Sequence, residues 1–556
     1  MPDPIGDLTN LTKLLMRLPS EAQALVTITR AGLVGPERPD KLLAAFQALE
    51  RYGAMGAGVS VAAIRYGDRA GLSDELGTLT FNDMDQRSNA LANAWRARGV
   101  GASTGVGILC RNHRGMFDAT FGTLKAGGRA LYLNTDFAGP QVNEVCAREG
   151  IEALVYDEEF AAVVAGAEAP KGRFLAWTDD PGSGPGDGPT IESLIAIGNP
   201  APPASPLEPG KVIILTSGTT GTPKGANRGQ PRSLTAPAAI LSRIPFRARE
   251  ATFVAPPAFH AWGLGMSALA IALGSTVVVR RRFDPEDTLI ALAEHRCTAL
   301  AVVPVILNRL LSLGEERIAA TDLSALRIIA SSGAQLEAAL ATKTMDTFGD
   351  VLYNLYGSTE VAWATIADPS DMRAAPGCVG KPPLGTTVRI YDDDGRRTPD
   401  GTTGRIFVGS GMEFGGYTGG GGKELIDGLM STGDVGHFDP QGRLFVDGRD
   451  DEMIVSGGEN VFPREIEELL AGHEAVLEAA AIGVPDETFG QRLRVFVVVR
   501  PGHDLDADAV REYVKANLAR FKVPRDVVFV EELPRNPSGK VLKRQLAERK
   551  AGRRAR

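Results

Sequence analysis

The chain has 556 residues, of which 43% are hydrophobic and 23% charged, and its formal net charge is −8. A chain of this length is too long for one compact core, so we expect two or more domains. The acidic balance argues against a general nucleic-acid binder, which would normally present a basic face. The four cysteines lie far apart without a C-x-x-C pair. That spacing favours buried free thiols in the reducing cytoplasm over a metal site or a disulfide framework.

Residues 1–65 are predicted to form a helical N-terminal extension. Leu11, Leu14, Leu15 and Leu18 recur at helical spacing. Such a helix either docks on the main domain or lies on a membrane surface, so peripheral contact with the inner face of a membrane stays open. The chain does not open with a basic segment followed by a long apolar run, and we therefore expect no cleaved signal peptide.

From Thr78 onward the sequence alternates between amphipathic and short apolar segments. We expect helices at Phe81–Arg98 and about residues 115–125, and strands at 106–109, 129–133, 153–156, 212–215, 298–303 and 326–329. Strands that alternate with helices predict largely parallel sheets covered by helices on both faces. A glycine- and proline-rich stretch at Asp179–Thr190 is expected to be a surface loop.

The segment from Phe253 to Val279 contains no charged residue and is followed directly by three arginines, as a membrane span would be. Two prolines and three glycines interrupt it. We therefore predict a loop, a buried helix near residues 263–273 and a strand at 276–279, rather than a transmembrane helix.

After Arg405 the pattern changes to short strands and tight turns, which predicts a small antiparallel region. Beyond residue 450 a helix from Pro463, the strand RLRVFVVVR, a helix at 506–518 and the strand DVVFV predict a small α+β domain. We accordingly divide this α/β chain into an N-terminal domain, residues 1–450, and a mobile C-terminal domain, residues 451–556.

The run LTSGTTGTPKGA at residues 215–226 follows the apolar strand KVIIL. Backbone N–H groups freed in such a turn, together with hydroxyls and Lys224, make a nest for phosphate oxygens. The run is not a Walker A loop, because Lys224 is preceded by Pro223 and followed by Gly225. A glycine-rich linker without a ligand is the alternative.

This run resembles the phosphate loop of the adenylate-forming superfamily, which comprises acyl-CoA synthetases, firefly-type luciferases and peptide-synthetase adenylation domains. Five further motifs match that family in order: SSGAQL at 331–336, NLYGSTE at 354–360, STGDVG at 431–436, GRDDEMIVSGGEN at 448–460 and NPSGKVLKR at 536–544. The overall sequence pattern is most similar to that of a fatty-acyl-CoA synthetase. One departure is the glycine-rich stretch FGGYTGGGGKEL at 414–425, whose backbone we expect to be loose.

The resemblance implies that the chain binds magnesium ATP. Tyr356 would lie against adenine, Asn354 would bond the adenine amine, and Asp434 would accept the ribose hydroxyls. Glu360 and Thr219 would hold the magnesium ion, a hard cation that prefers oxygen ligands. The full set of expected ATP-binding residues is Thr216, Ser217, Gly218, Thr219, Thr220, Gly221, Lys224, Gly333, Ala334, Asn354, Tyr356, Gly357, Asp434 and Arg449.

The resemblance also implies the residues of the reaction. Lys540 would stabilise the charge that develops between a carboxylate and the α-phosphate, with Thr359 and Glu360 beside it. His260, Trp262 and Gly333 would border the acyl group. Asp451 would be the hinge of the small domain, and Gly457 and Gly458 would line the channel for coenzyme A.

The predicted function is that of an acid:CoA ligase, which forms acyl-AMP and pyrophosphate from a carboxylic acid and ATP and then transfers the acyl group to coenzyme A. A fatty acid is the preferred substrate, and a homodimer is one expected form. Two alternatives remain at this point: an enzyme that loads a carrier-protein thiol, and a catalytically silent relative that only binds nucleotide. A luciferase-like oxidation has nothing in the sequence that requires it.

Overall fold

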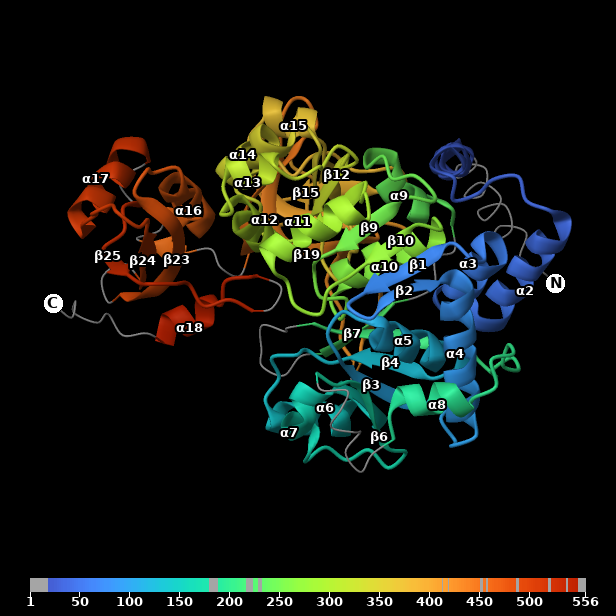
Figure 1. Ribbon diagram of the computed structural model, residues 1–556. Coiled ribbons are helices and arrows are strands. Elements are labelled where there is room, and N and C mark those ends of the chain that lie inside the picture. Colours follow the sequence, from blue (N-terminus) through green and yellow to red (C-terminus); the bar gives the residue numbers. More distant parts are fainter. Residues whose placement is uncertain are drawn as a thin grey trace, which may run out of the picture.

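The computed structural model of the protein describes residues 19–179, 189–216, 224–228, 233–412, 414–418, 420–450, 454–456, 459–486, 490–518, 522–536 and 539–548. A large body is built from the N-terminal and middle parts of the chain, and a small one from the C-terminal part (Figure 1). The positions Leu11, Leu14, Leu15 and Leu18 lie outside the described residues, as does most of the predicted loop at 179–190.

The N-terminal extension contains a helix at residues 19–31, followed by α2 (Pro39–Gly56) and α3 (Gly58–Tyr66). α2 packs on the large body through Tyr52, whose hydroxyl donates a 2.7 Å hydrogen bond to the backbone oxygen of Pro203. Its solvent side carries four exposed apolar side chains, Leu42, Leu43, Phe46 and Leu49.

One sheet of the large body has the strand order β17-β8-β7-β4-β3-β5-β6. Its strands are β3 (Gly105–Leu109), β4 (Arg129–Tyr132), β5 (Ile151–Asp157), β6 (Arg173–Trp177), β7 (Lys211–Thr216), β8 (Lys224–Arg228) and β17 (Phe414–Tyr417). The strands from β7 to β6 run parallel, whereas β8 and β17 are antiparallel. The associated helices are α4 (Phe81–Arg96), α5 (Arg114–Ala126), α6 (Gly139–Glu149), η1 (Glu158–Phe160), α7 (Ala161–Val164) and α8 (Ile191–Ile197).

The other large sheet has the order β14-β13-β12-β11-β9-β10-β1-β2. Its strands are β1 (Ala70–Asp74), β2 (Gly77–Thr80), β9 (Ala251–Val254), β10 (Thr276–Val278), β11 (Ala299–Val302), β12 (Ile328–Ser331), β13 (Leu352–Tyr356) and β14 (Thr365–Ala367). The associated helices are α9 (Thr235–Arg243), α10 (Ala261–Ala272), α11 (Pro285–Glu294), α12 (Pro304–Leu311), α13 (Glu315–Ala319), α14 (Ala338–Phe348) and α15 (Pro369–Ala374).

The inner strands of this second sheet are parallel and its edge strands β14 and β2 are antiparallel, which confirms the parallel-rich architecture. β12 begins at Ile328, two residues later than predicted. The reason is that the Leu326 N–H bonds the Leu323 oxygen in a turn, so Leu326 cannot yet join the ladder.

The uncharged stretch from Phe253 to Val279 divides as predicted into a loop, the helix α10 and the strand β10. Val254, Ile271 and Val277 are buried, so the absence of charge follows from packing inside the large body. Within the part of the chain that the structure describes, no helix is long and apolar enough to cross a membrane.

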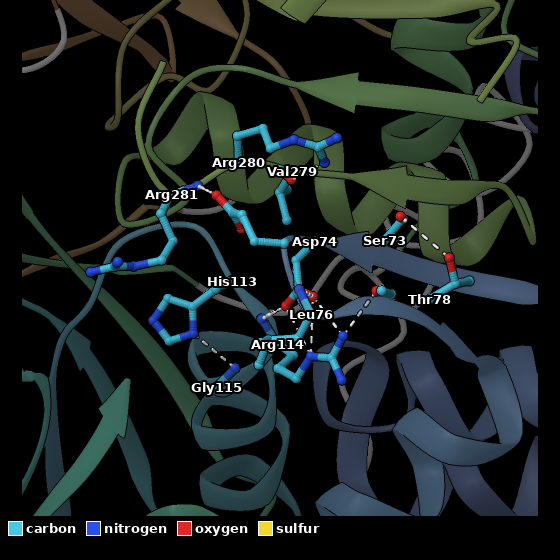
Figure 2. A network of polar contacts seen from close by, with 12 residues as sticks. Ser73, Asp74, Leu76, Thr78, His113, Arg114, Gly115, Val279, Arg280 and Arg281 are labelled. Atoms are coloured by element: carbon cyan, nitrogen blue, oxygen red, sulfur yellow. Dashed lines mark hydrogen bonds and ion pairs between the residues drawn. The ribbon is translucent and has the colours of Figure 1, made fainter. Parts of the chain in front are cut away.

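The β1–β2 hairpin is tied to α5 by a buried ion pair. Arg114, the first residue of α5, places Nη2 2.6 Å from Oδ1 of Asp74, and its backbone N–H donates to Oδ2 at 2.8 Å. Figure 2 shows this pair. The Arg281 N–H, just after β10 of the hairpin's own sheet, donates a 2.6 Å hydrogen bond to Glu75 Oε1 of the hairpin. Burial alone would raise the pKa of Asp74, but Arg114 more than offsets it and the pKa falls below its usual range. These contacts hold the two large sheets in one body.

A third, antiparallel sheet is formed by β15 (Thr387–Tyr391), β16 (Gly404–Gly409), β18 (Leu425–Ile426), β19 (Leu429–Phe438) and β20 (Leu444–Arg449). The Asp439–Gly442 turn joins β19 to β20, since the Gly442 N–H bonds the Asp439 oxygen. This confirms the small antiparallel region expected after Arg405.

The C-terminal part has its own sheet, β21 (Ile454–Ser456), β22 (Glu459–Val461), β23 (Val476–Asp486), β24 (Gly490–Val499) and β25 (Asp526–Phe529). Its helices are α16 (Pro463–Ala471), α17 (Ala507–Asn517) and α18 (Lys543–Glu548). From this small body one red loop reaches back to the large one (Figure 1). Gly539 in that loop lies so close to α12 that a Cβ atom there would come within 2.6 Å of Val305 Cγ1.

Candidate active site

The predicted site residues gather where the parallel strands of the second sheet end. Ser331 is the last residue of β12 and is paired in register with Asn354 of β13, which ends at Tyr356. In open α/β sheets, ligands bind outside the carboxyl ends of the strands. The antiparallel sheet contributes Asp434 from β19 and Arg449 from β20, which are themselves paired in register.

Tyr356, Asp434 and Arg449 form one polar cluster. The Tyr356 hydroxyl donates a 2.5 Å hydrogen bond to Oδ2 of Asp434, and Arg449 Nη1 lies 3.2 Å from Oδ1 of the same carboxylate. Burial raises the pKa of Asp434, while Arg449, Tyr356 and the charge of Lys540 all act to lower it. Burial also raises the pKa of Tyr356 well above its ordinary value, so the phenol stays a donor. The structure thus brings together residues from three separate motifs.

Glu360 lies in the turn that follows β13. Its Oε2 accepts a 2.9 Å hydrogen bond from the Ser358 hydroxyl, and its Oε1 accepts a 2.7 Å hydrogen bond from the Tyr417 hydroxyl. Gly357 is required by the tight turn, because a Cβ atom there would lie 2.2 Å from the Ala362 oxygen. Thr359 lies between Ser358 and Glu360 in this turn. The carboxylate is therefore held by two hydroxyls and keeps oxygen lone pairs for a hard cation.

Two buried polar atoms next to this turn have no hydrogen-bond partner among the described residues: Asn354 Oδ1 and Ser331 Oγ. Asn354 and Ser331 are both almost fully buried. An unpaired buried acceptor costs free energy, and unpaired polar groups of this kind call for an explanation such as a missing ligand. Beyond β12, Gly333 adopts a positive φ of 87° and is exposed, with the half-buried Ala334 beside it.

His260 and Trp262 lie at the start of α10. His260 Nε2 is buried without a partner among the described residues, and burial lowers the pKa of this imidazole to about 4. The side chain is consequently neutral at pH 7. The Trp262 indole N–H donates a 2.9 Å hydrogen bond to the Val302 oxygen, which orients the ring against the end of β11.

Asn112 is a buried residue of this region that the sequence analysis did not single out. It follows β3, and both the nitrogen and the oxygen of its side-chain amide form hydrogen bonds with the loop before His260. Nδ2 donates to the Pro256 oxygen at 2.9 Å, and Oδ1 accepts from the Ala258 N–H at 2.7 Å. One asparagine after an apolar strand carries no local signal for such a contact, since the partner lies 146 residues away.

The predicted phosphate loop begins at Thr216, the end of β7, and closes at Lys224, the start of β8, and these two residues pair in register. The intervening positions Ser217, Gly218, Thr219, Thr220 and Gly221 lie outside the described residues, as do Asp451, Gly457 and Gly458. Directly after the loop, the Gly225 N–H donates a 3.0 Å hydrogen bond to Thr418 Oγ1.

We expected the glycine-rich stretch at 414–425 to have a loose backbone. In the structure, however, Tyr417 and Thr418 in this stretch form specific hydrogen bonds. Tyr417 bonds Glu360, and the Thr418 hydroxyl donates to Glu149 Oε1 at 2.9 Å. β17 also adds its backbone to β8. The glycines alone would not order this segment, and its backbone is instead ordered by the pairing of β17 with β8.

Lys540 lies exposed in a tight turn of the C-terminal body. Its backbone N–H donates to Asn536 Oδ1 at 2.9 Å, and the Asn536 N–H returns a 2.9 Å bond to the Lys540 oxygen. The preceding residue, Gly539, rests on Val305 of the large body. Lys540 is near enough to Asp434 for its charge to lower the pKa of that carboxyl group.

A second cluster that could bind a metal ion lies around the end of β3. Single atoms of Cys110, His113 and Asp157 fall within 4.8 Å of one another, and all three residues are buried. His113 Nε2 lies 2.8 Å from Asp157 Oδ1, and the Gly115 N–H bonds His113 Nδ1. Because these atoms already bond each other and the backbone, we assign the cluster a structural role. All four cysteines are free and buried, which confirms that prediction.

Comparison with known proteins gives two family matches. The family described as AMP-binding enzyme matches residues 59–418, and the AMP-binding enzyme C-terminal domain matches residues 465–540. Feruloyl-CoA synthase of Amycolatopsis sp. is 33% identical over 88% of this chain and 95% of its own length. Fatty acid–[acyl-carrier-protein] ligase ScoC of Streptomyces coeruleorubidus is 28% identical over 85% of this chain and 92% of its own.

Among solved structures, ATP-bound MatB from Rhodopseudomonas palustris is similar with a TM-score of 0.76 and 27% identity. The similarity covers 88% of this chain and 98% of that one, so both bodies of the chain take part in it.

Proposed function

Because the chain belongs to the AMP-binding enzyme family, we propose that it is an acyl-CoA ligase that activates a fatty acid with ATP. The family membership confirms the resemblance to the adenylate-forming superfamily. The chain is an AMP-forming acyl-CoA synthetase. A cytoplasmic location goes with this proposal, because the cysteines suit a reducing compartment.

One observation carries the proposal: the turn that presents Lys540 rests on Val305 of the large body, where the lysine charge acts to lower the pKa of Asp434. In the proposed site Asp434 accepts hydrogen bonds from the ribose hydroxyls, and Lys540 lies beside the α-phosphate. An ammonium group there neutralises charge that grows in the transition state, where such a contact contributes most. A lysine in a solvated turn elsewhere on the small body would have had no such partner.

The nucleotide is proposed to lie along the carboxyl ends of β12 and β13. The unpaired Oδ1 of Asn354 suits the exocyclic amine of adenine, which would supply the missing donor. The Tyr356 ring would cover the base, and Arg449 would reach the ribose or the phosphate. Gly333 and Ala334 would let the base approach closely, and Thr216, Lys224 and the residues between them would hold the β- and γ-phosphates.

Glu360 would hold the magnesium ion that accompanies ATP, and Thr219 is proposed as its second protein ligand. That ion would neutralise phosphate charge during pyrophosphate release. The two hydroxyls on Glu360 fix the direction of its carboxylate, which leaves oxygen lone pairs available. Thr359 is proposed to contact the α-phosphate from the same turn.

In the first step an oxygen of the acid attacks the α-phosphorus and pyrophosphate leaves. In the second the coenzyme A thiolate attacks the acyl carbon and AMP leaves, so both steps balance without a further reactant. We propose that the small domain, residues 451–556, rotates about Asp451 between the steps. Lys540 would then withdraw, and Gly457 and Gly458 would border the thiol channel.

The substrate proposal rests on the uncharged surroundings of His260. No Asp, Glu, Lys or Arg occurs between Phe253 and Val279, and His260 itself is neutral. An acid whose far end carries a charge would find no partner in this segment, whereas an alkyl or aromatic tail would. A fatty acid is the preferred candidate, with Trp262 and Gly333 beside its carboxyl end.

The second candidate is an enzyme that passes the acyl group to a carrier-protein thiol, as the name of the Streptomyces coeruleorubidus relative states for that protein. Pyrophosphate release should be measured with magnesium ATP and a panel of acids from acetate through palmitate to benzoates and cinnamates. Acyl-CoA formation with one chain-length window supports the proposal. One equivalent of pyrophosphate and a bound acyl-adenylate that coenzyme A does not release would favour the carrier protein.

A further inference from the structure

Two neighbouring residues, Tyr417 and Thr418, join parts of the proposed ATP site that are far apart in sequence. Tyr417 is the last residue of β17, and its hydroxyl donates to Glu360, the carboxylate proposed to hold magnesium. Thr418 comes next and bonds Gly225, the second residue of β8, directly after the phosphate loop. This two-residue segment therefore contacts both the metal carboxylate and the strand that closes the phosphate loop.

The Thr418 hydroxyl forms hydrogen bonds with two groups at once. It accepts the Gly225 N–H at 3.0 Å and donates to Glu149 Oε1 at 2.9 Å. The Gly225 oxygen is a second acceptor within reach at 3.3 Å, but the carboxylate is nearer and carries the charge, so it takes the hydrogen. The backbone adds a further contact, since the Thr418 N–H donates to the Gly225 oxygen at 2.8 Å.

Glu149 supports this hydroxyl from the interior of the large body. It is the last residue of α6 and is almost fully buried. Arg148 Nη2 lies 2.8 Å from the same oxygen, Oε1, and pairs the buried carboxylate with a cation. Hydrogen bonds to charged groups are stronger than those between neutral groups, so Glu149 is a strong anchor for the Thr418 side chain.

Close packing also ties Thr418 to β8. A Cβ atom at Gly225 would lie 2.6 Å from Thr418 Oγ1, so the hydroxyl occupies the space that a larger residue at this position would need. Beyond Thr418, Gly420 and Gly421 adopt positive φ angles of 93° and 91°. Glycine loses the most backbone freedom on ordering, so this segment depends on side-chain contacts such as those of Thr418 to stay in place.

We propose that Thr418 is a positioning residue that couples the phosphate loop to the magnesium carboxylate. Glu149 and Gly225 hold Thr418, and the adjoining Tyr417 then directs Glu360. Loss of the Thr418 hydroxyl leaves the Gly225 N–H unpaired at the base of the phosphate loop and releases the support of Tyr417. The inference rests on the proposed function, because it assumes that the loop holds the β- and γ-phosphates and that Glu360 holds magnesium.

The coupling has a signature that general destabilisation lacks. Magnesium ATP needs both parts of the site, whereas AMP has no β- or γ-phosphate. Magnesium strengthens ATP binding by the same factor by which ATP strengthens magnesium binding, because the two effects are linked. That factor should shrink when the Thr418 hydroxyl is lost. A role confined to folding would weaken the binding of ATP and AMP alike.

The test compares Thr418→Ala with Thr418→Ser in the full chain, because these two variants differ by a single oxygen atom. Calorimetric titrations measure the binding of ATP with excess magnesium, of ATP with EDTA, and of AMP, all without an acid. Thr418→Ala should bind magnesium ATP about tenfold more weakly than the parent, while its affinity for AMP changes less than about twofold. Thr418→Ser should bind magnesium ATP within about threefold of the parent, because it keeps the hydroxyl.

The matched control is Thr288→Ala, which removes another buried hydroxyl, one that donates to the Asp284 oxygen at the start of α11. This variant should bind both nucleotides as the parent does. If circular dichroism shows that Thr418→Ala does not fold, Thr418→Val takes its place, because valine restores the lost volume.

A double variant with Tyr417→Phe tests whether Thr418 acts through its neighbour. If it does, the loss of magnesium ATP affinity in the double variant should be smaller than the product of the two single losses, because both changes release the same carboxylate.

Four results overturn the proposal: parental magnesium ATP binding in Thr418→Ala, equal weakening of magnesium ATP and AMP, a Thr418→Ser variant as weak as Thr418→Ala, or single losses that multiply in the double variant. If the coupling is found but no acid yields pyrophosphate or acyl-CoA, the proposed function fails and the coupling stands. If acids are activated and Thr418→Ala binds magnesium ATP as the parent does, the coupling fails and the proposed function stands.

Discussion

The Tyr417 hydroxyl donates a 2.7 Å hydrogen bond to Glu360, although 57 residues separate the two in sequence. Burial and the neighbouring carboxylate raise the pKa of this phenol, so Tyr417 remains a donor over the working pH range. The contact links β17, which pairs with the strand β8 that closes the phosphate loop, to the carboxylate proposed to hold magnesium. It also gives Tyr417 a definite contact within a glycine-rich stretch.

Tyr417→Phe should raise the KM for magnesium ATP by about ten- to a hundredfold, because Glu360 loses one of two hydroxyls that orient it while the ring packing is retained. Loss of one hydrogen bond to a charged group costs about 1.5–3 kcal/mol. Titration of activity with magnesium at fixed ATP checks this. Glu360→Gln should show a larger loss in the same titration, and equal KM values for parent and Tyr417→Phe would contradict the assignment.

Lys540→Ala should reduce adenylation by roughly 10²–10³-fold, the range for removal of one group that stabilises transition-state charge. Thioester formation from supplied acyl-adenylate should change little, since Lys540 is proposed to have withdrawn by then. Pyrophosphate exchange and single-turnover acyl transfer measure the two half-reactions separately. An equal loss in both would refute the role.

Asp451→Pro should produce the reverse pattern. Proline restricts the φ angle that a hinge residue must change, so the domain would stay in one orientation. Adenylation should persist while overall acyl-CoA formation is lost. A variant with parental overall turnover would remove Asp451 from the hinge assignment.

Asn354→Ala should weaken discrimination between ATP and GTP by up to about tenfold, the value of one hydrogen bond to a buried acceptor. The side chain leaves its Oδ1 unpaired in this buried position, as expected for a group that awaits a donor from the ligand. The ratio of kcat/KM for the two nucleotides is the readout. An unchanged ratio with a raised KM for both would indicate a packing role alone.

Lys125→Ala should destabilise the large domain by about 3–5 kcal/mol, as expected when one partner of a buried ion pair is removed. Lys125 is fully buried, its ammonium lies 2.7 Å from Asp85, and it also donates to Ser88 and Asn89. Urea unfolding monitored by fluorescence measures the difference in free energy of unfolding between the parent and the variant.

The matched control is Lys211→Ala, whose ammonium is 3.5 Å from Glu208 with both side chains more than half exposed. Surface pairs contribute about 0–1 kcal/mol, so this variant should unfold near the parental midpoint. If the two variants shifted equally, burial would not be what makes the Lys125 contact strong.

Local sequence determined the elements of this protein well. α5 starts after His113, whose imidazole accepts the Gly115 N–H, and ends at Gly127 in a left-handed conformation, because both ends are specified by neighbouring residues. The alternation of apolar strands and helices likewise determined the parallel-rich sheets, and the order of the motifs determined the family. Each helix cap and each motif is specified by residues close together in sequence.

Tertiary structure alone decided the contacts that join distant segments. Asn112 against Ala258, Tyr417 against Glu360, and Gln335 against Glu468 of the small body have no local signature. The strand that brings Tyr417 to the site is rich in glycine and has little propensity of its own, and it is ordered by pairing with β8. Such contacts depend on how sheets and domains pack, and packing selects partners by shape and charge in space, whatever their separation along the chain.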